Sequence, residues 1–125
     1  MTIDSGQLYR CMDNTVEVKS FQFALRIVNL HKYLRKHHNE FILSKQLLRS
    51  GTSVGANICE AQQAQSRPDF LSKLCIALKE AVETNYWLRL LHESNYLSDD
   101  QFSSTIQDCK ELERLLTSIV KTVRE

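Results

Sequence analysis

The chain has 125 residues, 42% of them hydrophobic and 25% charged, a length and composition that suit one globular domain. One proline and three glycines are too few turn formers for an all-β domain, so we expect a few long helices. The formal net charge of +1 does not draw the whole chain onto nucleic acid. No apolar run approaches the roughly 20 residues of a membrane-spanning helix, so we expect no membrane association.

The four cysteines, Cys11, Cys59, Cys75 and Cys109, lie far apart in the sequence, and none forms a CxxC pair. Three of them fall on apolar helix faces, where a free cysteine behaves as a small hydrophobic residue. We recognise no signal peptide, and we therefore expect reduced thiols and a cytoplasmic location.

Residues 1–13 lack helical periodicity, so we expect an N-terminal arm there and a single bundle domain over residues 14–125. Asn14 and Glu17 have the spacing of a capping box, which predicts that the first helix starts near Asn14. Apolar residues then recur at steps of three and four, as on the buried face of a bundle helix. These are Val16, Phe23, Ile27, Leu30 and Leu34, with Phe21, Ala24, Leu25 and Val28 expected to widen the same face.

A second helix is expected over residues 40–65, with Asn39 as its N-cap. It contains Gly51 and Gly55, and each interior glycine costs about 1 kcal/mol relative to alanine. We expect close approach of another helix at these glycines to offset that cost.

Ser66 and Pro68 predict the start of a third helix, and Asn95 is expected to end it in the left-handed conformation. Ser98 and Gln101 form a second capping box, which predicts a fourth helix. Four long amphipathic helices with short connections predict an all-α, antiparallel up-down-up-down four-helix bundle. No recurring period supports the alternative of a repeat protein.

Residues 41–97 carry polar and apolar residues at a distinctive spacing within a helix that contains glycine. They are Gln46, Leu47, Arg49, Ser50, Ser53, Val54, Asn57, Ile58 and Glu60, followed by Phe70, Ala77, Leu78, Glu83, Leu88 and Tyr96. This pattern resembles the four-helix-bundle proteins of the 23S rRNA intervening-sequence family. The chain departs from that pattern at Ala61, where glycine is usual, and at Glu80, where a small residue is common.

The resemblance implies a cytoplasmic bundle that assembles as a homopentamer, without enzymatic activity and without a cofactor. Related bundles, the accessory variability determinant proteins, accompany the reverse transcriptases of diversity-generating retroelements. There a strongly basic pentamer binds nucleic acid and the polymerase. The nearly neutral charge of this chain argues against that basic subtype.

The polar residues of the motif are Arg49, Ser53, Asn57, Glu60 and Glu83. Asn57 and Glu60 are neighbours on one helix, and packing of the second helix on the third would bring Glu83 towards Asn57. A group of this kind would suit a bound ligand or ion, or a small-molecule or metal-dependent enzyme. Hydrogen bonding that fixes helix register is the commoner role in bundles, and we favour it.

Carboxylate-bridged metal centres in bundles use Glu-x-x-His, and this motif does not occur in the sequence. Ser50 and Ser53 sit within a predicted helix, away from the exposed turns that present catalytic nucleophiles. We therefore predict no catalytic residue, no metal site and no cofactor.

The sharpest basic bias lies between Arg26 and Arg49. Its candidate nucleic-acid-binding residues are Lys32, Arg35, Lys36, Lys45 and Arg49. In an oligomer such a patch is repeated, so weak contacts with RNA or DNA would add, including contacts with ribosomal RNA or beside a reverse transcriptase. A solvated face with cations at a helix end is the simpler interpretation, and we keep nucleic-acid binding as the alternative.

Tyr86, Trp87, Leu90 and Leu91 make the end of the third helix apolar over an arc wider than one bundle face can bury. We expect them to form an oligomer interface, with burial in the core as the alternative. The sequence thus predicts a non-enzymatic homo-oligomer, a pentamer by resemblance, that acts as a structural or interaction module and has a protein partner or, as the alternative, nucleic acid.

Overall fold

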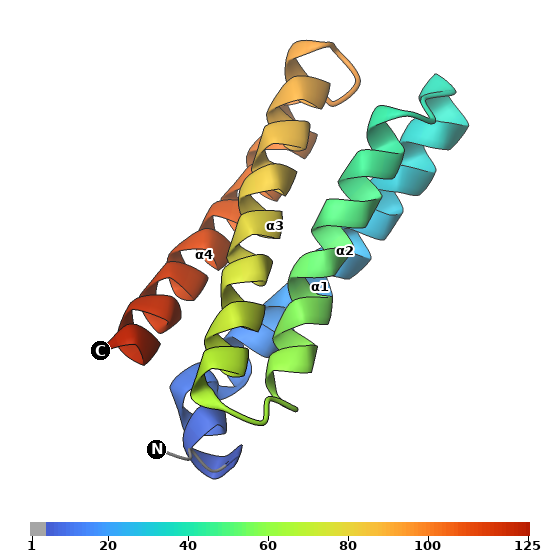
Figure 1. Cartoon of the computed structure of the whole chain (residues 1–125). Coiled ribbons are helices and arrows are strands. Elements are labelled where there is room, and N and C mark those ends of the chain that lie inside the picture. The colour runs from blue at the N-terminus through green and yellow to red at the C-terminus, as the bar shows by residue number, and fades with distance from the viewer. Residues whose placement is uncertain (1–4) are drawn as a thin grey trace.

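The computed structural model describes the backbone of residues 5–125 and the side chains of residues 15–125. The described residues form four helices and no strand: α1 (Ser5–His38), α2 (Leu43–Ala61), α3 (Arg67–Glu93) and α4 (Asp99–Arg124). Figure 1 shows the α1–α2 and α3–α4 connections at one end of the bundle and the α2–α3 connection at the other. Helix α2 packs against α1 and α3, and α4 packs against α3 and α1. The predicted up-down-up-down four-helix bundle is confirmed.

Helix α1 begins at Ser5, so its predicted start near Asn14 is wrong. Helix elongation is cooperative, and a helix anchored in the core extends through a neighbouring stretch that contains no proline. Position 14 therefore lies inside a helix, where no N-cap is needed, and its side chain is outside the described residues. The division between an arm over residues 1–13 and the bundle domain stays a prediction.

Helix α1 ends at a left-handed residue. Asn39 has φ 49°, a conformation that asparagine tolerates better than most residues. The backbone N–H of Glu40 then donates to the carbonyl oxygen of Leu34 over 3.1 Å, which satisfies one of the last carbonyls of the helix. Asn39 therefore closes α1, and its predicted role as the N-cap of α2 is wrong.

Helix α2 is capped instead by the carboxylate of Glu40. Its Oε1 accepts the backbone N–H groups of Ile42 and Leu43 over 3.1 and 2.9 Å, and its Oε2 accepts that of Ser44 over 2.7 Å. Burial raises the pKa of Glu40, but these backbone hydrogen bonds outweigh burial and leave the pKa below its ordinary value. The negative charge also suits the positive end of the helix dipole.

The predicted start and end of α3 and the predicted start of α4 are confirmed. The Ser66 side chain accepts a backbone N–H from the first turn of α3, where Pro68 lies. Asn95 has φ 69° just after α3. Ser98 and Gln101 form both hydrogen bonds of the capping box at α4.

The two interior glycines of α2 face α1 at close range. A Cβ at Gly51 would lie 2.8 Å from both Cγ1 and Cγ2 of Ile27, and a Cβ at Gly55 would lie 3.3 Å from the carbonyl oxygen of Ser20. The expected close approach of a second helix at these positions is confirmed. The helix itself ends at Ala61, earlier than predicted.

The core contains apolar residues of all four helices, and the stripe predicted for α1 needs one correction. Val16, Phe23 and Ile27 are at most 2% exposed, whereas Phe21 and Leu25 are 66% and 53% exposed. Helix α1 packs mainly against α2 and α4, so its buried arc is narrow, and the exposed Phe21 and Leu25 lie outside that arc. The expectation that they widen the buried face is therefore wrong.

Candidate functional site

The polar residues of the motif do not gather at one place. Arg49 of α2 forms ion pairs with two carboxylates of α3, contacting Glu83 closely and Glu80 Oε2 at 3.6 Å. Trp87 Nε1 donates to the same Glu83 carboxylate over 3.3 Å. The Glu80 side chain is only 13% exposed, so Arg49 neutralises a largely buried charge there. This cluster joins α2 to α3.

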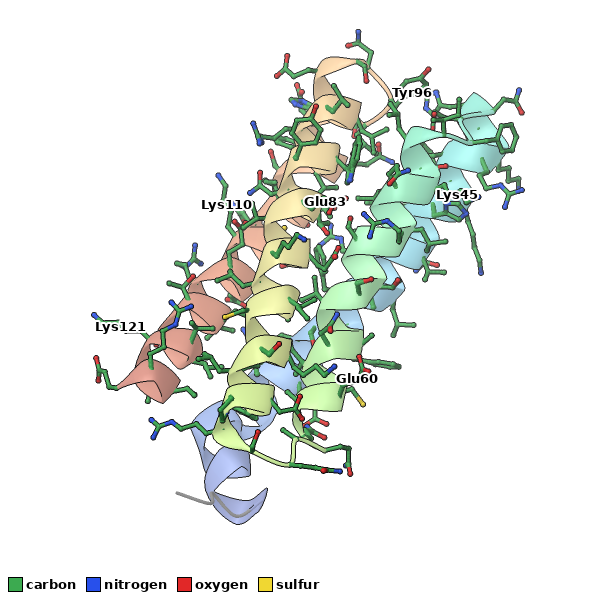
Figure 2. All side chains as sticks on the ribbon, in the orientation of Figure 1. Lys45, Glu60, Glu83, Tyr96, Lys110 and Lys121 are labelled. Carbon is green, nitrogen blue, oxygen red and sulfur yellow. The ribbon has the colours of Figure 1, made fainter. Side chains whose placement is uncertain are left out.

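The remaining motif residues bond within α2. Ser53 Oγ donates to the carbonyl oxygen of Arg49 over 2.6 Å, and Asn57 Nδ2 donates to that of Ser53 over 2.9 Å. Glu60 is exposed near the end of the helix, as Figure 2 shows. The structure therefore brings Arg49 and Glu83 together and leaves Asn57 and Glu60 apart from Glu83.

A buried hydroxyl pair lies between α2 and α3. Ser50 and Thr84 have no exposed surface, and their hydroxyl oxygens lie 3.0 Å apart. Thr84 Oγ1 also donates to the carbonyl oxygen of Glu80 over 2.7 Å, so the pair is satisfied without water. Sequence reasoning missed this pair, although Thr84 stands at the helical spacing of the apolar core residues around it.

The thiols and histidines show no arrangement for metal binding in residues 15–125. No three His, Cys, Asp or Glu side chains of that part could hold a metal ion together. Cys59 is exposed, Cys75 is half-buried and Cys109 is buried, and all three are free thiols. Burial, with the adjacent negative charge of Glu113, raises the pKa of the Cys109 thiol, so Cys109 is protonated at neutral pH. None of the described helices has an apolar stretch that could span a membrane.

Four of the five predicted cations lie where α1 meets α2, and Figure 2 shows Lys45 near that connection. They are Lys32, Arg35, Lys36 and Lys45, all exposed. Among the described residues none of the four pairs with a carboxylate, and the Arg35 guanidinium lies 5.3 Å from the centroid of the Phe41 ring. The fifth predicted cation, Arg49, is held in the ion pairs with α3.

The predicted interface on α3 divides between surface and core. Leu91 has no exposed surface, Trp87 and Leu90 are half-buried, and Tyr86 is 50% exposed. Leu91 follows Thr84 and Leu88 on the buried arc of α3, so its assignment to a surface is wrong. Contact of Tyr86, Trp87 and Leu90 with another copy stays a prediction.

A larger apolar surface lies on the outer side of α1 and α2, and we call it the α1–α2 face. Val18, Phe21 and Leu25 are 51%, 66% and 53% exposed and follow one another at helical spacing. They border a groove of about 790 Å³ whose α2 wall has the small residues Thr52, Gly55, Ala56 and Cys59. Sequence reasoning missed this face because it assigned Phe21 and Leu25 to the buried stripe of α1. The first helix has more apolar residues than one buried stripe can hold, and this excess was the sequence signal for an exposed apolar face.

Comparison with known proteins identifies the family. The sequence profile of the 23S rRNA-intervening sequence protein family matches residues 12–118. No curated protein matches the chain. A crystal structure of a protein of unknown function, from the S23 ribosomal protein family of Bacteroides thetaiotaomicron VPI-5482, is 57% identical with a TM-score of 0.85. The match covers 86% of this chain and 99% of that protein. The chain belongs to the family of 23S rRNA-intervening sequence proteins.

Proposed function

We propose that the chain is a non-enzymatic interaction module of the cytoplasm that assembles with copies of itself through the α1–α2 face. The observation that carries this proposal is the stripe of Val18, Phe21 and Leu25, each at least half exposed. Single exposed apolar residues are ordinary, but a contiguous patch beside a groove is typical of a protein interface. The free thiols of residues 59, 75 and 109 suit a reducing compartment.

The shape of the α1–α2 face supports a specific contact. The α1 side has bulky side chains, and the α2 side has small ones that leave room for a neighbouring side chain. Full burial of a side chain such as Phe21 or Leu25 stabilises a contact by about 1.5–3 kcal/mol. A face of this kind that meets a different face of the next copy forms a ring when the rotation between copies closes and an open filament when it does not. The family resemblance implies that the ring is a pentamer.

Light scattering of three chains tests the proposal. We expect the wild-type chain to have the mass of a pentamer and Leu25→Glu to have the mass of a monomer, because a carboxylate cannot be buried unpaired. The matched control is Val82→Glu, which places the same charge at a 52% exposed apolar position on α3 and should leave the mass unchanged. A monomeric wild-type chain, or an oligomeric Leu25→Glu chain, would contradict it.

Nucleic-acid binding by Lys32, Arg35, Lys36 and Lys45 is the second candidate function. It is favoured by the absence of carboxylate partners for these four cations among the described residues, and by the exposed Phe41 ring beside Arg35. Phosphate binding by such a cluster weakens as salt is added. Salt-sensitive retention of the chain on immobilised RNA or DNA would support this candidate, and loss of that retention in a Lys32→Ala/Arg35→Ala/Lys36→Ala variant would locate the binding at this cluster. Equal retention of that variant would exclude this cluster.

A further inference from the structure

The outer side of α3 and α4 carries a second group of cations, which sequence reasoning did not single out. On α3, Lys79 and Arg89 are exposed at positions that share one side of the helix, with Tyr86 between them. On α4, three exposed cations follow at steps of four and seven residues and line one side of that helix. They are Lys110, Arg114 and Lys121. In Figure 2, Lys110 and Lys121 extend from α4 on the side away from α2.

The two rows lie next to each other because α3 and α4 pack side by side. Asn85 Nδ2 donates to Glu113 Oε2 over 2.9 Å, and Arg124 Nη2 lies 3.6 Å from Cys75 Sγ. These contacts fix the register of the two helices over the stretch that carries the cations. We call Lys79, Arg89, Lys110, Arg114 and Lys121, together with Tyr86, the α3–α4 strip.

The carboxylates of this stretch face other partners. Glu80 and Glu83 pair with Arg49 of α2, and Glu111 pairs with Lys19 of α1. Glu113 accepts the amide of Asn85 at the helix contact. Among the described residues, therefore, no carboxylate forms an ion pair with the cations of the α3–α4 strip, and Glu113 is the one acidic residue at the contact between the two rows. Further exposed acidic residues lie at the two ends of the strip, with Glu93, Asp99 and Asp100 towards the α3–α4 connection and Glu125 after Lys121.

An exposed aromatic ring stands among these cations. Tyr86 is 50% exposed, and the Arg89 guanidinium lies 5.8 Å from its ring centroid. Arg89 Nε donates to Asn85 Oδ1 over 2.9 Å, which holds the guanidinium beside the ring. Rows of cations with an exposed aromatic side chain are the arrangement that binds single-stranded nucleic acid, because cations take the phosphates and the ring stacks on a base.

We infer that the α3–α4 strip is a binding surface for single-stranded nucleic acid, with its cations on the phosphates and Tyr86 stacked on a base. The strip is separate from the α1–α2 face and from the cluster that contains Lys32. The Tyr86 ring, which the sequence alone assigned to contact with another copy, is thereby assigned to nucleic acid. A basic surface exists although the chain is almost neutral, because the carboxylates of the neighbouring helix sides are used in ion pairs. RNA and DNA share the chemistry that the strip recognises.

Fluorescence anisotropy with labelled mixed-sequence single strands of RNA and of DNA, and with a duplex, tests this inference. We expect the full chain to bind a single strand more tightly than the duplex. Each phosphate contact on a single strand contributes about 0.7 to the slope of log affinity against log salt. Raising the salt from 50 to 200 mM should therefore weaken binding less for a Lys110→Gln/Arg114→Gln variant than for wild type. The fold-loss of affinity should be about sevenfold smaller for the variant.

Two further variants separate this surface from its alternatives. Tyr86→Leu keeps an exposed apolar residue but removes stacking, and should weaken binding by about fivefold or more. Lys32→Gln/Lys36→Gln removes the same charge from the other cluster and should bind as wild type does. The inference is overturned if wild type binds neither single strand, or if only the Lys32→Gln/Lys36→Gln variant loses binding. It is also overturned if polyglutamate displaces the strand as well as unlabelled strand does, which would indicate an acidic protein partner.

Discussion

A methyl group added at Gly51 tests the close packing of α1 against α2. It would lie 2.8 Å from both Cγ1 and Cγ2 of Ile27, which is fully buried. Ile27 is β-branched and has one dominant rotamer in a helix, so its Cγ1 and Cγ2 atoms cannot turn away. Gly55 offers a matched control, because its added methyl would meet the Ser20 carbonyl oxygen at 3.3 Å, a less severe overlap than the one at Gly51.

The two substitutions gain the same stability from helix propensity and differ in the cost of packing the added methyl group. Each replaces a helical glycine by alanine, which gains about 1 kcal/mol of helix propensity, and this gain cancels in the difference. Overpacking of a filled core costs about 1–3 kcal/mol, and this cost falls mainly on Gly51→Ala. We expect Gly51→Ala to be less stable than Gly55→Ala by about 1–2 kcal/mol.

Urea unfolding followed by circular dichroism, at one fixed chain concentration, measures this difference. In a small protein it corresponds to a midpoint shift of roughly 1 M urea. Ile27→Ala removes the clashing atoms at its own cost of about 2–5 kcal/mol, and combined with Gly51→Ala it should destabilise by less than the sum of the two changes. Gly51→Ala at least as stable as Gly55→Ala, or strict additivity with Ile27→Ala, would refute the reasoning.

Three other predictions concern single residues and are checked by the same unfolding measurement. Glu40→Gln should cost about 1 kcal/mol at neutral pH, because a neutral amide caps α2 less well, whereas Glu60→Gln at an exposed position should cost nothing measurable. In the folded chain the pKa of Glu40 lies below its ordinary value of 4.5. The stability that the Glu40 carboxylate contributes is therefore complete above the pKa that Glu40 has in the unfolded chain, and it is lost as the pH falls through the lower pKa of the folded chain. The stability difference between wild type and Glu40→Gln should shrink in that acidic range. Leu91→Ala should destabilise the bundle by about 2–5 kcal/mol, whereas a residue that contacted only another copy would leave the fold of one chain unaffected. Arg49→Met should cost about 1–3 kcal/mol because it strands the Glu80 carboxylate, and adding Glu80→Gln should recover part of that loss; an unchanged double variant would show that the ion pair contributes little.

Helix ends that depend on a few neighbouring residues could be predicted from the sequence. The Ser98–Gln101 capping box and the left-handed Asn95 depend on residues close in the chain, and the structure has both. Asn39 was a harder case, because asparagine suits both an N-cap and a left-handed C-terminal position. The choice was decided by Glu40, whose carboxylate reaches the α2 amides only when the chain turns as it does.

The surfaces were less predictable because they depend on which side of each helix faces a neighbour. Phe21 and Leu25 fit the spacing of a core stripe, yet α1 packs mainly against α2 and α4 and leaves both side chains exposed. Leu91 read as surplus apolar surface, yet α3 buries it. The α3–α4 strip depends on ion pairs such as that of Glu83 with Arg49, which join distant parts of the chain and leave no local trace in the sequence.

The native thiol of Cys59 gives the most direct test of assembly through the α1–α2 face. It is exposed in the single chain and lines the groove beside Phe21, whereas Cys109 is buried and provides an internal reference. Alkylation of the unmodified chain over a range of protein concentrations, read by peptide mass spectrometry, reports how accessible each thiol is. Assembly through this face predicts that Cys59 is protected at high concentration and becomes reactive on dilution, while Cys109 stays protected. A Cys59 rate that does not change with concentration, in samples that light scattering shows to be oligomeric at the higher concentrations, would contradict the proposed interface.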